Sequence, residues 1–145
     1  MTIYITNQQK HTKIDCQKIE NLTKNILLYL NQSGAELSIL LVDDGEMQKL
    51  NQQYRGIDKT TDVLSFEASL PGISSPVLGD VVISVETAQK QALERGHDII
   101  EEILHLLVHG ILHLLGYDHE ISEEEYLIMA LKEQDILNFI KKGND

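Results

Sequence analysis

The sequence is poor in the residues that build disulfide frameworks and membrane spans. Cys16 is its only cysteine, so the chain can form neither an intramolecular disulfide nor a cysteine-based zinc site. No apolar run is long and charge-free enough to span a membrane, and the N-terminal MTIYITNQQK lacks the apolar core of a secretion signal. We therefore expect a cytoplasmic protein without a membrane partner.

Positive charge is also scarce. Twelve Lys and Arg residues stand against 23 Asp and Glu, which gives a net charge of −11. Nonspecific nucleic-acid binding needs basic surface to replace counterions, so the average charge argues against it, and we expect no DNA partner. Lys49, Arg55 and Lys59 nevertheless fall close together, which leaves a local basic groove open.

The rest of the composition is that of an ordinary globular protein. A length of 145 residues suits one domain, residues 1–145, with 42% hydrophobic and 24% charged residues. Apolar periodicity predicts strands over 2–6, 36–42, 60–67 and 78–85, the last two as a hairpin, and helices over 15–30, 45–54, 86–95 and 122–141. We expect Gly34 to end the first helix, Asp43 and Asp44 to cap the second, and both prolines, Pro71 and Pro76, to lie in a surface loop.

One further helix, IIEEILHLLVHGILHLL at 99–115, has the clearest boundaries. Asp98 followed by Glu101 is a capping-box pattern, and Gly116 is a typical residue just past a helix C-terminus. This helix is apolar nearly all round, so we expect it to be buried against the sheet. About five helices packed on a small mixed sheet, with this helix at the centre, predict an α+β fold.

Three histidines lie in HGILHLLGYDH (109–119), at the end of the buried helix. His109 and His113, four residues apart, share one helix face and can direct both imidazoles at one tetrahedral ion. Gly116 lets the chain reverse, so that His119 can supply a third ligand. Three protein ligands leave one position open, as in catalytic zinc sites. The spacing therefore predicts one zinc per chain.

This spacing is also that of a large, zincin-like class of zinc peptidases, which carry a glutamate base directly after the first histidine. The position here is Gly110. The residues thus leave open a peptidase or other metal-dependent hydrolase that lacks the usual base, and a protein in which zinc only stabilises the fold. His105 is a candidate hydrogen-bond donor to the ligands, substrate contact or buried structural residue. Asp118 either orients His119 or stabilises a turn.

The same histidine segment, together with NQQYRGIDKTTDVLSF (51–66) and LGDVVIS (78–84), resembles the YbeY family of bacterial endoribonucleases, the rRNA maturation factors. The three motifs cover most of residues 51–119 in the family's order. The resemblance implies a zinc-dependent, single-strand-directed endoribonuclease acting in 3′-end maturation of small-subunit (16S) rRNA and in ribosome quality control, with the rRNA precursor and the small subunit as partners. By position, it implies catalytic roles for Arg55 and for His109, His113 and His119. A non-catalytic, zinc-stabilised ribosome assembly factor is the alternative.

The missing glutamate disables peptide hydrolysis more than phosphodiester cleavage. An amine leaving group must be protonated, whereas a phosphoryl group chiefly needs its negative charge offset, which a metal and a guanidinium can do.

Without the resemblance, Arg55 would be a solvated residue or a partner of Asp58. Asp62 and Ser65 would be ordinary turn and strand residues. Tyr54 and Phe66 are candidates either to stack on bases or to join the core.

Overall fold

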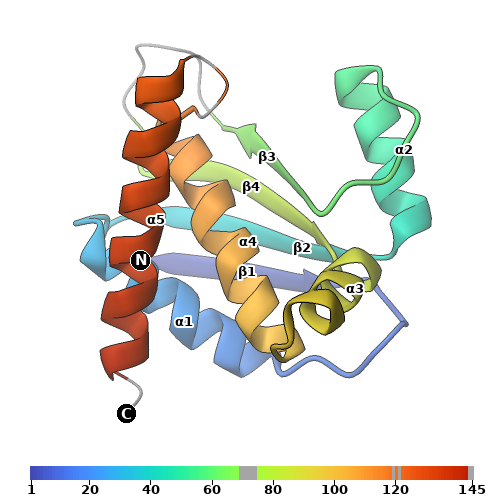
Figure 1. The fold of residues 1–145 in the computed structure, drawn as a ribbon, viewed down its shortest axis with the longest axis horizontal. Coiled ribbons are helices and arrows are strands. Elements are labelled where there is room, and N and C mark those ends of the chain that lie inside the picture. Colours follow the sequence, from blue (N-terminus) through green and yellow to red (C-terminus); the bar gives the residue numbers. More distant parts are fainter. Residues whose placement is uncertain (69–74, 119, 121, 144–145) are drawn as a thin grey trace.

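The computed structural model describes residues 1–68, 75–118, 120 and 122–143. Within them the chain forms four strands and five helices (Figure 1). The strands are β1 (Thr2–Asn7), β2 (Glu36–Val42), β3 (Val63–Glu67) and β4 (Val77–Ser84), and the helices are α1 (Cys16–Tyr29), α2 (Asp44–Arg55), α3 (Val85–Arg95), α4 (Ile99–Leu114) and α5 (Glu123–Gly143). The predicted α+β fold is confirmed. Of the predicted proline loop, Pro71 lies outside the described residues.

The four strands form one mixed sheet in the order β1-β2-β4-β3. The β1–β2 and β2–β4 pairs are parallel, and β3 runs antiparallel to β4 at one edge. The register pairs Leu64 with Val82 and Ser65 with Val81, which confirms the predicted hairpin. This arrangement places β3 at the side of the sheet where the cleft described below opens.

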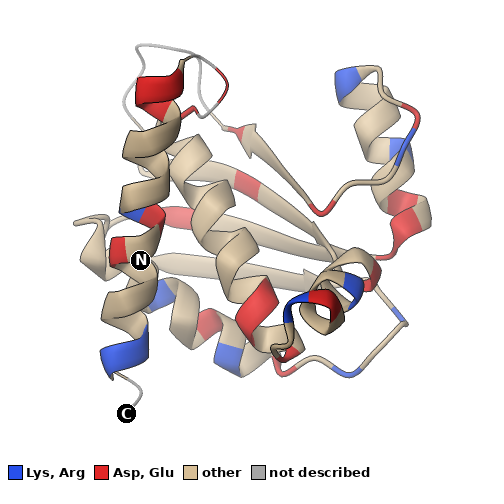
Figure 2. Cartoon of the chain, viewed as in Figure 1, with Lys and Arg blue, Asp and Glu red and all other residues tan. Residues whose placement is uncertain are grey.

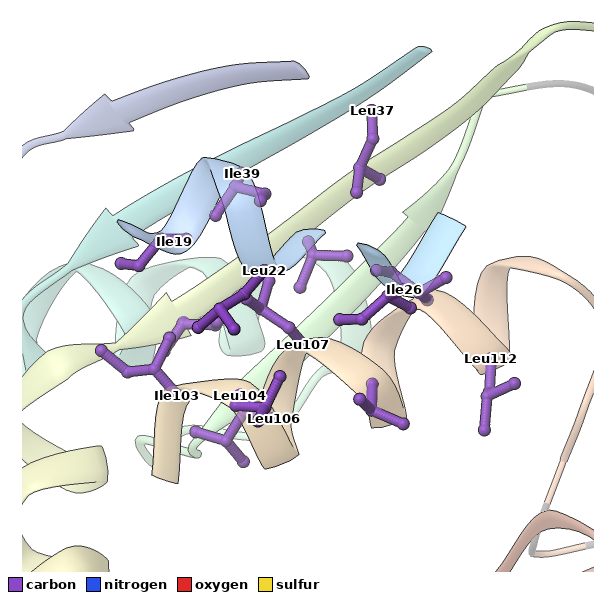
Figure 3. Packing of buried hydrophobic residues seen from close by; sticks show 14 of the residues in the cluster. Ile19, Leu22, Ile26, Leu37, Ile39, Ile103, Leu104, Leu106, Leu107 and Leu112 are labelled. Carbon is purple, nitrogen blue, oxygen red and sulfur yellow. The ribbon is translucent and has the colours of Figure 1, made fainter. Parts of the chain in front are cut away.

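Helices cover both faces of the sheet. Val81 and Ile83 point to the face that carries α1, α4 and α5, whereas Val82 points to the opposite face, where it packs with Met47 of α2. Side chains of α1, β2 and α4 meet in one shared core, in which Leu107 is fully buried (Figure 3). Burying a side chain of this size contributes roughly 1.5–3 kcal/mol. The expected burial of the histidine-bearing helix is therefore confirmed. Throughout the described residues, every helix is too short or too polar to serve as a transmembrane segment.

The predicted caps of α4 are confirmed, whereas Gly34 does not end the first helix and Asp44 does not cap the second. Asp98 accepts a hydrogen bond from the Glu101 backbone N–H at 2.9 Å, and Gly116 adopts a left-handed φ of 99° after the helix. The first helix ends before Gly34, because Asn31 already takes φ 60°, and asparagine tolerates this conformation better than most residues. Asp43 occupies the N-cap of α2, but its side chain makes no capping hydrogen bond.

Asp44 joins the starts of α2 and α3 instead of acting as a cap. Its carboxylate accepts hydrogen bonds from the hydroxyls of Thr60, Ser84 and Thr87. Burial raises the pKa of Asp44, but these hydrogen bonds and the charge of Lys90 outweigh burial, so the pKa lies below its ordinary value. The ionised carboxylate thus holds two helices against the end of β4.

Candidate metal centre

The two described histidines of the predicted trio converge at the C-terminal part of α4. The Nε2 atoms of His109 and His113 lie 3.1 Å apart, and their rings meet edge to face with centroids 4.7 Å apart. Two nitrogens bound to one tetrahedral zinc at 2.0–2.1 Å would stand about 3.3–3.4 Å apart. The distance between the two nitrogens is therefore compatible, within a few tenths of an ångström, with two ligands of one zinc ion.

A carboxylate from α5 holds one of these imidazoles. Glu133 Oε1 lies 2.7 Å from His109 Nδ1, and both side chains are about 30% exposed (30% for His109 and 29% for Glu133). An ionised carboxylate only accepts hydrogen bonds, so this contact favours the tautomer in which Nδ1 donates to Glu133, the arrangement in which a metal-binding imidazole uses Nε2 as its ligand atom. Sequence analysis missed Glu133, because no local pattern marks one acid among the many of α5 as a partner of α4.

The third predicted ligand, His119, lies outside the described residues. Within the described ranges, no three His, Cys, Asp or Glu side chains come together as a metal site. The structure thus brings together two of the three predicted ligands, and the complete set of His109, His113 and His119 stays a prediction.

Arg55 and the two histidines line one cleft with a volume of about 710 Å³. Arg55 is in the last turn of α2, where Gly56 ends the helix in the left-handed conformation with φ 71°. The buried Asn51 donates a hydrogen bond to the Lys59 carbonyl at 2.8 Å and so anchors the loop that follows. Among the described residues Arg55 makes no ion pair, and Asp58 instead accepts from Gln48. The guanidinium is therefore exposed in the same cleft as the imidazoles.

Asp62 and Ser65, which line the cleft, tie β3 to α3 and α4. The Asp62 carboxylate accepts from the Val63 backbone N–H at 2.7 Å and from Gln91 of α3 at 3.2 Å. The Ser65 hydroxyl donates to the Gly110 carbonyl of α4 at 3.1 Å. Both residues therefore position the strand and helix that carry the cleft.

The position that holds the glutamate in zinc peptidases faces the sheet in this chain. A Cβ added at Gly110 would lie 2.8 Å from Val81 Cγ1 and 3.2 Å from Ser65 Oγ. Both distances are too short for ordinary packing, and neither neighbour is the far end of a flexible side chain. Glycine at this position thus allows α4 to approach β3 and β4 closely, and a glutamate would have to displace them.

His105 and Asp118 differ in their surroundings. His105 is not among the described residues that line the cleft, and its ring lies 5.4 Å from that of His97 near the start of α4. Burial lowers the pKa of His105 below its ordinary value, and the opposing charge of Glu102 offsets this only in part. Asp118 accepts a hydrogen bond from the Glu120 backbone N–H at 2.8 Å, as a turn residue does.

Comparison with known proteins identifies close relatives over nearly the whole chain. The family model described as "Endoribonuclease YbeY" matches residues 4–141. The endoribonuclease YbeY of Petrotoga mobilis is 45% identical over 86% of this chain and 85% of its own, and that of Persephonella marina is 44% identical over 96% and 92%. A Thermotoga maritima protein solved in solution superimposes with a TM-score of 0.68 at 28% identity, covering 96% of this chain and 89% of that one.

Proposed function

Because this chain belongs to the endoribonuclease YbeY family, we propose that it is a zinc-dependent endoribonuclease that cuts single-stranded RNA. Its proposed substrate is the precursor of small-subunit (16S) rRNA, in 3′-end maturation and ribosome quality control in the cytoplasm. The observation that carries the proposal is the pair of Nε2 atoms 3.1 Å apart, in a cleft that also contains Arg55.

In this proposal His109, His113 and His119 hold one zinc ion. Bound there, the ion would supply Lewis-acid stabilisation of negative charge and would make hydroxide accessible at neutral pH. Glu133 keeps the His109 ring in the orientation and tautomer that leave Nε2 available. Loss of such an outer hydrogen bond commonly weakens metal binding by 10- to 100-fold.

Arg55 is proposed to bind the scissile phosphate. Its planar guanidinium stays charged and can donate two parallel hydrogen bonds to phosphoryl oxygens. The side chain extends from the last turn of α2, which ends at Gly56 and is followed by the loop that Asn51 anchors. Charge that develops on the phosphoryl oxygens is thus stabilised by a donor that the fold positions beforehand.

We propose water as the attacking group. Attack by the ribose 2′-hydroxyl would call for a free base and acid, yet His97 and His105, the remaining histidines near α4, lie together away from the cleft lining. In hydrolysis, a water oxygen bonds to phosphorus, the P–O bond to the leaving ribose oxygen breaks, and that oxygen takes up a proton. Mass spectrometry of the products should find linear phosphate ends, whereas a 2′,3′-cyclic phosphate would mean that the RNA supplies its own nucleophile.

The test of the proposed function compares the zinc-loaded parent with Arg55→Ala on single-stranded and duplex RNA. We expect the variant to keep its zinc and fold but to cleave about 10²- to 10³-fold more slowly, the usual effect of removing one positioned electrostatic donor. Lys49→Ala, which removes a cation from the same helix outside the cleft, is the matched control. Arg55→Ala activity within about twofold of the parent would refute the phosphate role, and a folded, zinc-loaded parent without any cleavage would favour the assembly-factor alternative.

A further inference from the structure

An exposed aromatic ring stands at the rim of the cleft, beside Arg55. Tyr54 of α2 is 60% exposed, and its ring packs against that of Phe66 on β3 with centroids 5.0 Å apart and an interplanar angle of 60°. Phe66 is itself packed against the small core formed by Val42, Met47 and neighbours between α2 and the sheet. The Tyr54 ring is thus held in place on one side while most of its surface contacts solvent.

The charged side chains that line the cleft are mostly acidic, so an RNA ligand needs contacts through its uncharged parts as well as through its phosphates. Among the described residues that line the cleft, Arg55 is the one Lys or Arg, whereas Asp62, Glu67, Asp118 and Glu120 are acidic. The first turn of α5 adds three further glutamates nearby in the chain (Figure 2). A polyanion therefore gains little here from electrostatic attraction alone, since that gain depends on the number of phosphates that cations neutralise.

Nucleobases offer such uncharged surface. A base face stacks on an aromatic side chain regardless of sequence, and the face is accessible only when the base is unpaired. Tyr54 and Arg55 are consecutive residues that line the same cleft, so a nucleotide can place its base on the first and its phosphate against the second.

We infer that Tyr54 is a stacking platform for one unpaired base of the RNA substrate, next to the phosphate bound by Arg55. This inference rests on the proposed function and adds to it a physical source of single-strand preference. A paired base already has its faces covered by neighbours in the duplex and cannot reach the ring without unstacking. Tyr54 is a binding residue in this account and takes no part in bond breaking.

The absence of tryptophan makes a direct test available. Tyr54→Trp creates the only tryptophan of the chain, so its fluorescence reports on this position alone. We expect saturable quenching on addition of a short single-stranded RNA, recorded in the cold directly after mixing with electrophoresis to verify that the RNA is intact. The same oligonucleotide with abasic sites, and its duplex form, should leave the fluorescence unchanged. Binding shown by anisotropy without any quenching by the intact single strand would overturn the inference.

Matched variants separate stacking from a structural role. Tyr54→Leu should weaken single-stranded RNA binding about tenfold, as expected for loss of one stacked base, while Tyr54→Phe should stay within about twofold of the parent. Tyr4→Leu removes a tyrosine of similar exposure, 55%, on β1 outside the cleft lining and should have no effect. Equal weakening of intact and abasic RNA by Tyr54→Leu would overturn the inference, since a stacking ring can act only on a base.

The inference and the proposed function can fail separately. A parent that cleaves RNA but is insensitive to Tyr54→Leu refutes stacking alone. If Tyr54→Trp is quenched by single-stranded RNA and Tyr54→Leu weakens binding, but the parent never cleaves, the nuclease proposal alone is refuted. A parent that binds no RNA refutes both.

Discussion

A histidine is paired with a carboxylate near each end of α4, at the same distance but in different surroundings. At the N-terminal end His97 Nε2 lies 2.7 Å from Glu102 Oε1, and at the C-terminal end His109 Nδ1 lies 2.7 Å from Glu133 Oε1. The Glu102 side chain is 0% exposed, whereas that of Glu133 is 29% exposed. Distance alone therefore does not distinguish the two pairs.

The two pairs differ in what the remaining polar atoms contact. At the first pair, Glu102 Oε2 accepts from the Arg95 guanidinium at 2.7 Å, and His97 Nδ1 faces the carboxylate of Glu101 at 3.7 Å. The polar atoms of this pair thus contact other side chains of the same cluster, with an ion pair between Arg95 and Glu102, as in a structural cluster. At the second pair, the other nitrogen of His109 lies 3.1 Å from the Nε2 atom of His113, and both side chains line the cleft. Two imidazole nitrogens at this distance can bind one cation together, which makes the second pair the candidate metal centre and the first a structural pair.

The largest effect should come from His113→Ala. Loss of one of three ligands should abolish zinc binding at one equivalent per chain, because metal affinity depends on the complete ligand set. His105→Ala, on the same half-buried stripe of α4 but outside the cleft lining, should keep its zinc. Elemental analysis of both purified variants measures the zinc content per chain. Full occupancy in His113→Ala would show that the C-terminal end of α4 is not a metal centre.

Glu102→Ala should lower the free energy of unfolding by roughly 1–3 kcal/mol, because it removes the hydrogen bonds of a fully buried carboxylate while the remaining Arg95 is half exposed and can be solvated. Its zinc affinity should not change, since it lies at the other end of α4. Urea denaturation of the metal-free protein and a zinc-competition titration measure the two quantities.

Glu133→Ala is the control for Glu102→Ala, because it removes the carboxylate of the other pair. We expect it to weaken zinc binding 10- to 100-fold. In the metal-free protein it should lower the free energy of unfolding by at most about 1 kcal/mol, since this pair is partly exposed. Equal effects of the two substitutions on zinc affinity would remove the distinction between the two ends of α4.

Between the two ends, Gly110→Ala tests how tightly α4 is packed. The added methyl group should cost about 1–3 kcal/mol in overpacking against Val81, offset by about 1 kcal/mol of helix propensity, for a net loss of about 1 kcal/mol. Gly45→Ala in α2, where nothing lies within 4 Å of the added methyl group, should leave stability unchanged or raise it. Thermal denaturation of both variants measures this, and a stabilised Gly110→Ala protein would show that the helix has room at this position.

The smallest expected effect is the pH dependence of stability that His105 of α4 causes. Because the folded-state pKa of His105 lies below the ordinary 6.5, the unfolded chain takes up this proton first as the pH falls. The contribution of neutral His105 to the free energy of unfolding is therefore complete above about pH 6.5. It is lost as the pH drops through the folded-state pKa. His105→Gln in the metal-free protein should lose less stability than the parent between pH 7.5 and 5.5 in urea denaturation. A steeper loss in the variant would contradict the direction of this shift.

The sequence by itself determined the helix that carries the candidate ligands. The Asp98 cap, the apolar periodicity, the four-residue interval from His109 to His113 and the left-handed Gly116 all depend on residues within a few positions of one another. Local patterns of this kind predict local structure, and the β3–β4 hairpin was predictable for the same reason. At the end of α1, both Asn31 and Gly34 are residue types that can end a helix. Asn31 adopts the left-handed conformation, three residues before the expected glycine.

Only the tertiary structure decided which distant groups meet at the histidines. Glu133 lies 24 residues beyond His109 in the chain, and Arg55 reaches the cleft from a helix on the opposite face of the sheet. Gly110 is in contact range of Val81 only because α4 packs directly on the sheet. These contacts depend on the relative placement of whole helices and strands, which is set by the packing of the shared core, and no periodicity within a single segment encodes it.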